Sequence, residues 1–269
     1  GYGQTNTVGT VAAGATITAT QWATLLTRIA SAAAHSGTSI SAISNPTAGS
    51  TISAYTALST NVSAITNNNA AASGTDASAT TSTTATWNAS ATTSKVITFA
   101  SADAMRYFFN AGGMIRMSFS RSGGSATTQN TSWTNLLASS GTIVLTGDGG
   151  SKSIAGTAYT GTTKIGGSGT NTTLATSTGA YNLSGAAVTL YKQLSATYTY
   201  TSNYININAT DTATSITFAV SCIDTGARPW QDSVDGTLSM VTTIRQPSTT
   251  YIANTWGTVS QNATVWATA

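Results

Sequence analysis

Side chains that carry acid–base, nucleophilic or metal chemistry are scarce in this chain of 269 residues. The chain holds one His, one Cys, no Glu and seven Asp. A Ser-His-Asp triad would have to be built on His35, and a zinc site needs several Cys and His side chains together. Glycoside hydrolysis usually needs two placed carboxylates, which seven scattered Asp supply poorly. We therefore expect that the protein is not an enzyme and that it holds no cofactor and no metal.

The acidic residues closest in sequence are Asp224, Asp232 and Asp235. Calcium takes six or more oxygen ligands, and loops that supply them are denser in carboxylates than this segment. The sequence Asp148-Gly149-Gly150 is typical of a turn. We accordingly expect no calcium site at either place.

Three further features have structural interpretations that we favour over chemical ones. Cys222 falls in an apolar strand pattern, where a thiol acts as a small buried hydrophobe. His35 ends a predicted helix, where a polar or positive tip suits the negative helix terminus. The glycine-rich segment 161–169 has its Lys164 before the glycines and no helix pattern after them, so it fails the context of a phosphate-binding loop.

Composition excludes several classes of partner. Charged residues make up 6% of the chain against roughly 25% in an ordinary domain. The net charge of +3 comes from ten basic residues that are spread along the chain without a run of Lys or Arg. This is too weak a footprint for nucleic acid. No apolar stretch approaches 18 residues, so we expect no membrane insertion.

An amphipathic helix is predicted in the N-terminal region. Trp22, Leu25, Leu26 and Ile29 follow one another at helical spacing and form one apolar stripe. Thr20 is the expected N-cap, and Ser36-Gly37 the expected stop. The stripe is too short for a coiled coil, so we expect the helix to dock either on the β domain of this chain or on another subunit. A second, weaker helical pattern runs from Thr51 to Thr66.

The remainder predicts a mainly β protein with an antiparallel β-sandwich-like domain. The expected divisions are an N-terminal docking region at 1–66, a low-complexity linker or strap at 67–94, the sandwich at 95–247 and a C-terminal extension at 248–269. Apolar residues alternate in Met114–Arg121 and Ser215–Ile223. Further strands are expected at Lys95–Ala100, Thr142–Thr146, Ala187–Leu194, Ala196–Thr201, Tyr204–Asn208 and Thr237–Arg245, with a short helical turn at Trp133, Leu136 and Leu137.

Threonine-rich strands predict sheets whose outer faces carry hydroxyls in place of charges. Such sheets lack electrostatic protection against edge-to-edge pairing, and we therefore expect a homo-oligomer. Large aromatic residues are the usual anchors of interfaces. We expect several of a group of five to lie between chains, with a single-chain core as the alternative for each: Tyr198, Tyr200, Tyr204, Trp230 and Trp256.

Two segments carry a resemblance to a known class of proteins. In Phe99–Arg116 the triplet Tyr107-Phe108-Phe109 leads into Asn110-Ala111-Gly112-Gly113 and a strand, and Gln129–Leu137 follows closely. Together with Gly1–Thr5, Gln21-Trp22 and His35–Thr38, this resembles virion structural proteins of tailed bacteriophages, in particular tail-fibre and appendage proteins of marine and cyanobacterial phages. Those proteins often have Gln after the His, where this chain has Ser36. The resemblance implies a virion component and gives no catalytic residues.

Three classes of function are therefore open. The first is a structural subunit of a phage virion, in a tail fibre, collar or baseplate, where it serves assembly or host attachment. Its partners would be copies of itself, with a trimer favoured by analogy with phage fibres, other virion proteins, and a host-surface glycan or receptor. The second is a bacterial extracellular filament or adhesin subunit. The third, a glycan-depolymerising tailspike, fits the sparse carboxylates poorly.

Overall fold

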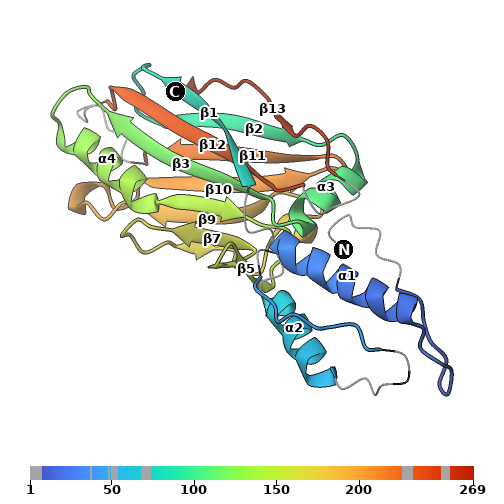
Figure 1. The fold of residues 1–269 in the computed structure, drawn as a ribbon. Coiled ribbons are helices and arrows are strands. Elements are labelled where there is room, and N and C mark those ends of the chain that lie inside the picture. Colours follow the sequence, from blue (N-terminus) through green and yellow to red (C-terminus); the bar gives the residue numbers. More distant parts are fainter. Residues whose placement is uncertain are drawn as a thin grey trace.

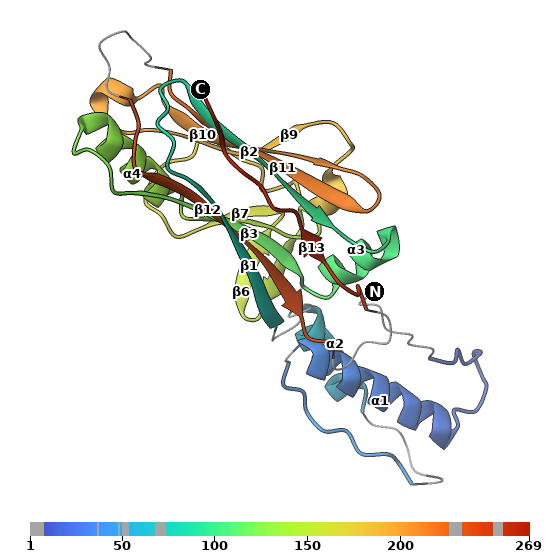
Figure 2. The same cartoon turned by 90° about the horizontal axis from the view of Figure 1, so that it is seen from above.

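The protein pairs two antiparallel sheets face to face, with two helices projecting from one end of the sandwich (Figures 1 and 2). The structure is a computed structural model and describes residues 8–36, 38–47, 49, 54–67, 74–225, 233–249 and 255–269. Within that part of the chain the side chains of His35, Ser36, Asn67 and Tyr198 are not described. The expected mainly β, antiparallel, sandwich-like fold with a helical N-terminal region is confirmed.

The first sheet has five strands among the described residues, and neighbouring strands are antiparallel. Their order is β1 (Gly74–Thr83), β12 (Thr237–Pro247), β3 (Met114–Ser122), β4 (Thr142–Leu145) and β7 (Thr162–Ile165). A hairpin of β5 (Ser151–Ile154) and β6 (Thr157–Thr160) leaves the chain between β4 and β7.

The second sheet has seven strands among the described residues. The order is β13 (Ser260–Gln261), β2 (Ser90–Thr98), β11 (Ser215–Ile223), β10 (Tyr204–Asp211), β9 (Val188–Leu194) and β8 (Thr173–Leu174), while β14 (Ala267–Thr268) also pairs with β2. Short 3-10 turns lie at Ala180–Asn182 and Tyr198–Tyr200.

The core fills the space between the sheets. The alternating residues Ile216, Phe218, Val220 and Cys222 of β11 are fully buried, and so are Ile115 and Met117 of β3. These side chains belong to one continuous cluster with residues from both sheets. Each large apolar side chain that is fully buried in this way contributes roughly 1.5–3 kcal/mol. The alternation read from the sequence is therefore confirmed in these two strands.

Two helices close the sandwich. Helix α3 (Ala102–Asn110) begins at Ser101, whose Oγ accepts from the main-chain N–H of Ala104 at 3.0 Å. Its Phe108 packs edge to face on Trp256, with ring centroids 5.8 Å apart. A Cβ on Gly113 would lie 2.6 Å from the Phe108 ring, so the chain turns out of α3 only with a glycine there. The sequence pattern predicted the turn but not the helix.

Helix α4 (Thr128–Ser140) occupies the place where we expected only a short helical turn. Thr127 caps it, with Oγ1 accepting from the N–H of Asn130 at 3.1 Å. Trp133, Leu136 and Leu137 face the core as their spacing indicates. The Trp133 ring lies 4.8 Å from that of Trp87 in an edge-to-face contact. The additional turns include a polar N-terminal half that is nonetheless buried.

Three sequence-based expectations require correction. Segment 67–94 is not a linker throughout, because β1 and the start of β2 lie in it and pair with β12 and β11. Ala196–Thr201 contains the 3-10 turn Tyr198–Tyr200 and no strand. The C-terminal extension completes the sandwich: residues 255–269, which we call the C-terminal strap, bury Trp256, Val259 and Trp266 in the common core. The sandwich therefore begins near residue 74 and includes the strap.

Candidate assembly site on the N-terminal helices

Helix α1 (Ala19–Ser36) starts with a reciprocal cap. The Thr18 hydroxyl accepts from the main-chain N–H of Gln21 at 3.2 Å, and the Gln21 side-chain oxygen accepts from the N–H of Thr18 at 2.9 Å. This is a capping box, which satisfies two N–H groups that the helix start leaves open. The sequence-based prediction of Thr20 as the N-cap is wrong by two residues. Gln21 is the third residue of the helix and its side chain bonds to the N–H of Thr18, so Thr18 is the cap.

The apolar stripe of α1 is covered unevenly. Trp22 is buried, with 7% of its surface exposed, while Leu25, Leu26 and Ile29 are half-buried. Helix α1 packs against α2 (Tyr55–Asn67), and both project from the sandwich in the two views (Figures 1 and 2). We call α1, α2 and the connecting residues 38–47 the helical arm. A stripe that is half-covered on a projecting helix leaves apolar surface for a further partner.

One buried amide holds the arm together. Asn61 of α2 is 2% exposed. Its Oδ1 accepts from the N–H of Ser41 at 3.0 Å, and its Nδ2 donates to the carbonyl of Ser41 at 2.8 Å. The side chain thus replaces a main-chain partner and fixes the connecting segment on α2. This role could not be predicted from the sequence, because nothing in the spacing distinguishes a buried Asn in a helix from an exposed one.

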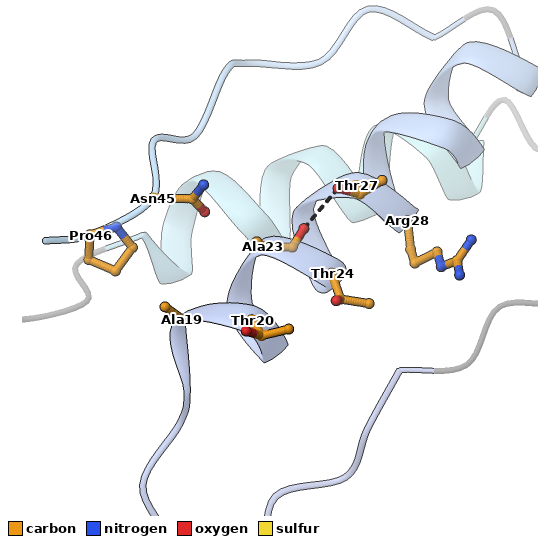
Figure 3. Close-up of a pocket in the computed structure, with 8 residues that line it drawn as sticks. All are labelled: Ala19, Thr20, Ala23, Thr24, Thr27, Arg28, Asn45 and Pro46. Atoms are coloured by element: carbon orange, nitrogen blue, oxygen red, sulfur yellow. Dashed lines mark hydrogen bonds between the residues drawn. The ribbon is translucent and has the colours of Figure 1, made fainter. Parts of the chain in front are cut away.

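Two grooves run along α1. The larger, of about 560 Å³, is shown in Figure 3 and lies between the helix and the connecting segment at Asn45 and Pro46. Thr20, Thr24 and Arg28 follow one another along its helical wall. The second groove, of about 360 Å³, is the more apolar and contains Leu26, Ile29, Ile40 and Ile43. Among the described residues that line the two grooves, Arg28 is the single charged one.

Two buried polar atoms of α1, Trp22 Nε1 and Arg28 Nε, have no hydrogen-bond partner among the described residues. Arg28 also lines the larger groove. On α2, Tyr55 and Val62 are spaced by seven residues on one face and are 82% and 48% exposed. Tyr55 and Val62 therefore leave exposed apolar surface on α2 that another chain can cover.

The predicted aromatic interface residues separate into different environments. Trp256 is 2% exposed in the core beside Phe108, and Tyr200 is 8% exposed. For these two the structure favours the single-chain core, the alternative to an interface. Tyr204 is half-buried beneath Lys192, whose Nζ lies 4.0 Å from the ring centroid. The Tyr198 side chain and all of Trp230 lie outside the described residues.

Asp224 and Asp235 hold α4 in place. Asp235 accepts from the Ser125 hydroxyl at 2.7 Å and from Arg121 Nη2 at 3.1 Å, and Asn130 also donates to it. The hydrogen bonds from Ser125, above all, lower the pKa of the Asp235 carboxyl. Asp224, which is buried, accepts from the Gln129 side chain.

These contacts give both carboxylates hydrogen-bond partners within the chain. Asp232 lies outside the described residues, and in the described ranges no three His, Cys, Asp or Glu side chains are grouped to hold a metal ion. Gln129 and Asn130, which anchor the Asp residues to α4, were not identified from the sequence. Buried amides of this kind have no spacing that distinguishes them from exposed ones.

The other candidate chemical groups have structural surroundings. Cys222 is completely buried, and burial raises the pKa of its thiol, so the reactive thiolate is disfavoured. Lys164, in the glycine-rich segment, donates to the Gly169 carbonyl at 2.7 Å and to Gln193 Oε1 at 2.9 Å. The ammonium group thus ties the loop after β7 to β9. His35 lies at the penultimate position of α1, and its side chain is not described.

Comparisons with known proteins give no relative. No family model, no curated protein and no solved structure matches the chain. Among the described residues, no helix has the length and apolar character needed to span a membrane.

Proposed function

We propose that the protein is a structural subunit of a tailed-phage virion that assembles into a homo-oligomer through its helical arm. In this role it belongs to a tail fibre, collar or baseplate and contributes to particle assembly or host attachment. The observation that carries the proposal is the half-covered stripe of Leu25, Leu26 and Ile29 on a helix that projects from the sandwich. The resemblance of two sequence segments to phage appendage proteins gives the assembly its setting.

Assembly would lower the free energy of the protein by covering half-buried side chains of the arm. Covering the remaining surface of several half-buried side chains gains roughly 25 cal/mol for each Å² removed from water. The same patch occurs on every copy, and closed symmetry lets identical patches cover one another. A homo-oligomer is therefore the simplest assembly that completes the arm.

The edge of the first sheet also bears on whether the protein assembles. Strand β1 is the end strand of the first sheet among the described residues, and it carries Ser, Thr and Ala with a single charge, at Asp76. Exposed edges normally carry charges or proline that prevent pairing with other chains. The C-terminal strap covers part of this edge, where Gln261 Nε2 and Trp266 Nε1 donate to the main-chain oxygens of Ala77 and Thr81, and an assembly would cover the remainder.

The location of the protein on phage particles is tested by antibody labelling. Antibodies raised against the purified protein should mark the tail or its appendages on phage particles imaged by electron microscopy. Marking of filaments on bacterial cells, with none on particles, would instead support the extracellular filament or adhesin subunit.

Assembly is tested by matched variants of α1. The double variant Leu25→Asp with Ile29→Asp places charges on the half-covered stripe and should yield monomers that keep a folded sandwich. The control, Leu25→Met with Ile29→Val, retains apolar side chains at the same positions and should assemble normally. Equal oligomeric mass for both variants would contradict assembly through the arm.

A further inference from the structure

We propose that the outer face of the first sheet binds a neutral saccharide in a groove beside the β5–β6 hairpin. The groove has a volume of about 410 Å³, within the roughly 300–1,000 Å³ typical of small-molecule sites. The inference rests on the host-attachment part of the proposed function and names the chemistry of what would be attached. It concerns a surface distinct from the helical arm.

The floor of the groove follows from the register of four strands. Val241 of β12, Ser118 of β3, Thr142 of β4 and Ile165 of β7 are successive cross-strand partners and form one row. All four line the groove. Two apolar side chains thus flank two hydroxyls, a combination that suits the C–H faces and hydroxyl edges of a sugar ring.

A second row adds a charged group. Thr243 of β12, Arg116 of β3 and Val144 of β4 are partners in register. Thr243 and Arg116 line the groove, whereas Val144 is fully buried. The row therefore runs from an open, polar half of the sheet into a covered, apolar half.

The cover over the apolar half is the hairpin. Ile154 of β5 and Tyr159 of β6 form a small separate cluster with Met114 and Val144 on this outer face. Each of the four is nearly inaccessible to solvent. Because the hairpin is anchored by this packing, it forms a fixed wall, and Tyr159 and Thr157 face the groove from it.

Three charges gather here in a chain that has very few. Asp76 Oδ2 lies 3.6 Å from Arg116 Nη1, and Asp76 Oδ1 lies 3.2 Å from Arg245 Nη1. Arg116 and Asp76 line the groove, while Arg245 supports Asp76 as its cross-strand partner on β12. The two lining charges balance each other, and Arg245, which pairs with the same carboxylate, gives the three groups a net charge of +1.

Hydrogen-bonding capacity remains on these groups. Each carboxylate oxygen of Asp76 can accept more than the one arginine contact described, and the Arg116 guanidinium has five N–H donors in total. The hydroxyls of Ser118 and Thr142 can both donate and accept. A fixed acceptor, a fixed donor and two adaptable hydroxyls match the alternating hydroxyls of a neutral sugar, whereas an anionic ligand would meet Asp76.

Multivalency makes such a site effective. The groove is shallow, and the Asp76 side chain is 42% exposed, so water competes for each hydrogen bond and a single site binds weakly. A homo-oligomer presents several identical grooves, and linked sites can raise the overall affinity by a factor of about 10²–10⁴. The assembly and the groove therefore serve the same attachment.

The experiment uses the full chain on an array of bacterial surface oligosaccharides, both neutral and acidic, followed by nuclear magnetic resonance titration with the neutral oligosaccharides that bind. We expect binding to neutral members that is insensitive to salt. The double variant Ser118→Ala with Thr142→Val should bind roughly tenfold more weakly, as expected for two lost hydrogen bonds. The matched control, Thr217→Val on β11 of the second sheet, should bind as the wild type does.

Several results would overturn the inference. They are binding to no neutral oligosaccharide, binding to acidic members only, or binding that the Ser118/Thr142 variant leaves unchanged. Thermal unfolding of each variant establishes that weaker binding does not come from loss of the fold. The mass of each sample separates the two proposals: an oligomer without saccharide binding refutes the groove alone, and a monomer that binds saccharide refutes assembly alone.

Discussion

The ammonium nitrogen of Lys95 lies 2.7 Å from the main-chain oxygen of Asn262 and fastens the C-terminal strap to β2. Lys95 points into the sandwich and is 1% exposed. The Asn262 side chain accepts from the N–H of Val96 at 2.7 Å in return. This pair helps to hold the strap on β2, together with the pairing of β13 and β14 and the buried Trp256, Val259 and Trp266.

Lys95 gives a pH-dependent prediction. Burial lowers the pKa of its ammonium group in the folded protein. As the pH rises from the folded pKa toward the unfolded value of about 10.4, the unfolded chain holds this proton and the folded chain does not. The free energy of unfolding of the wild type should therefore rise relative to that of Lys95→Met over this window. Denaturant unfolding of both proteins at several pH values measures the difference, and parallel curves would refute the burial of a charged lysine.

Asp235 gives a prediction with the same sign in the acid range, because its folded pKa is also lowered. Its pKa is lowered in the folded state, so its stabilising contribution is complete above the ordinary aspartate pKa and is lost as the pH falls through the folded value. Wild type should be more stable than Asp235→Asn at neutral pH, and the two should converge in acid. Unfolding midpoints between pH ~7 and pH ~2 provide the measurement. A difference that persists unchanged to the lowest pH would show that the carboxylate charge is not what stabilises α4.

Trp22→Ala tests the packing of the arm. Removing a large buried aromatic side chain costs about 3–5 kcal/mol. Because Trp22 lies in the arm and outside the common core, the loss should appear in hydrogen exchange of α1 before that of the sandwich strands. A variant that assembles normally with unchanged exchange in α1 would count against a packed role for Trp22.

His35→Gln tests the absence of a chemical role. His35 lies in the last turn of α1, and Gln keeps a polar tip at that position. We expect normal assembly and nearly unchanged infectivity in phage that carry the substitution, measured as plaque titre. Complete loss of infectivity in particles that assemble normally would reopen a catalytic or receptor-binding role for this residue.

The sequence predicted those parts of the fold in which burial alternates. Strand β11 matches its expected bounds because Ile216, Phe218, Val220 and Cys222 alternate with less buried residues. Strand β1 was missed because its inward positions include Ala79 and Thr81, which differ little from the outward ones. Helix α3 was missed because its aromatic residues are consecutive, and α1 was found because its apolar residues keep helical spacing.

The candidate site was less predictable than the fold. The stripe of α1 was read from its spacing, but how far other segments cover it depends on Asn61 and on residues 38–47. The groove beside the β5–β6 hairpin needs strands that are distant in sequence to come into register, as Asp76 and Arg245 do. Aromatic residue type did not separate core from interface, since Trp256 packs inside its own chain.

Copies of this chain assemble in the function that we propose, and the molar mass of the purified protein in solution is the direct test. With few charges involved, assembly should be nearly insensitive to ionic strength. The measurement is the molar mass at micromolar concentration in low and in high salt, by light scattering after size exclusion. We expect a closed homo-oligomer, a trimer by analogy with phage fibres, under both conditions. A monodisperse monomer under both conditions, with no partner added, would contradict it.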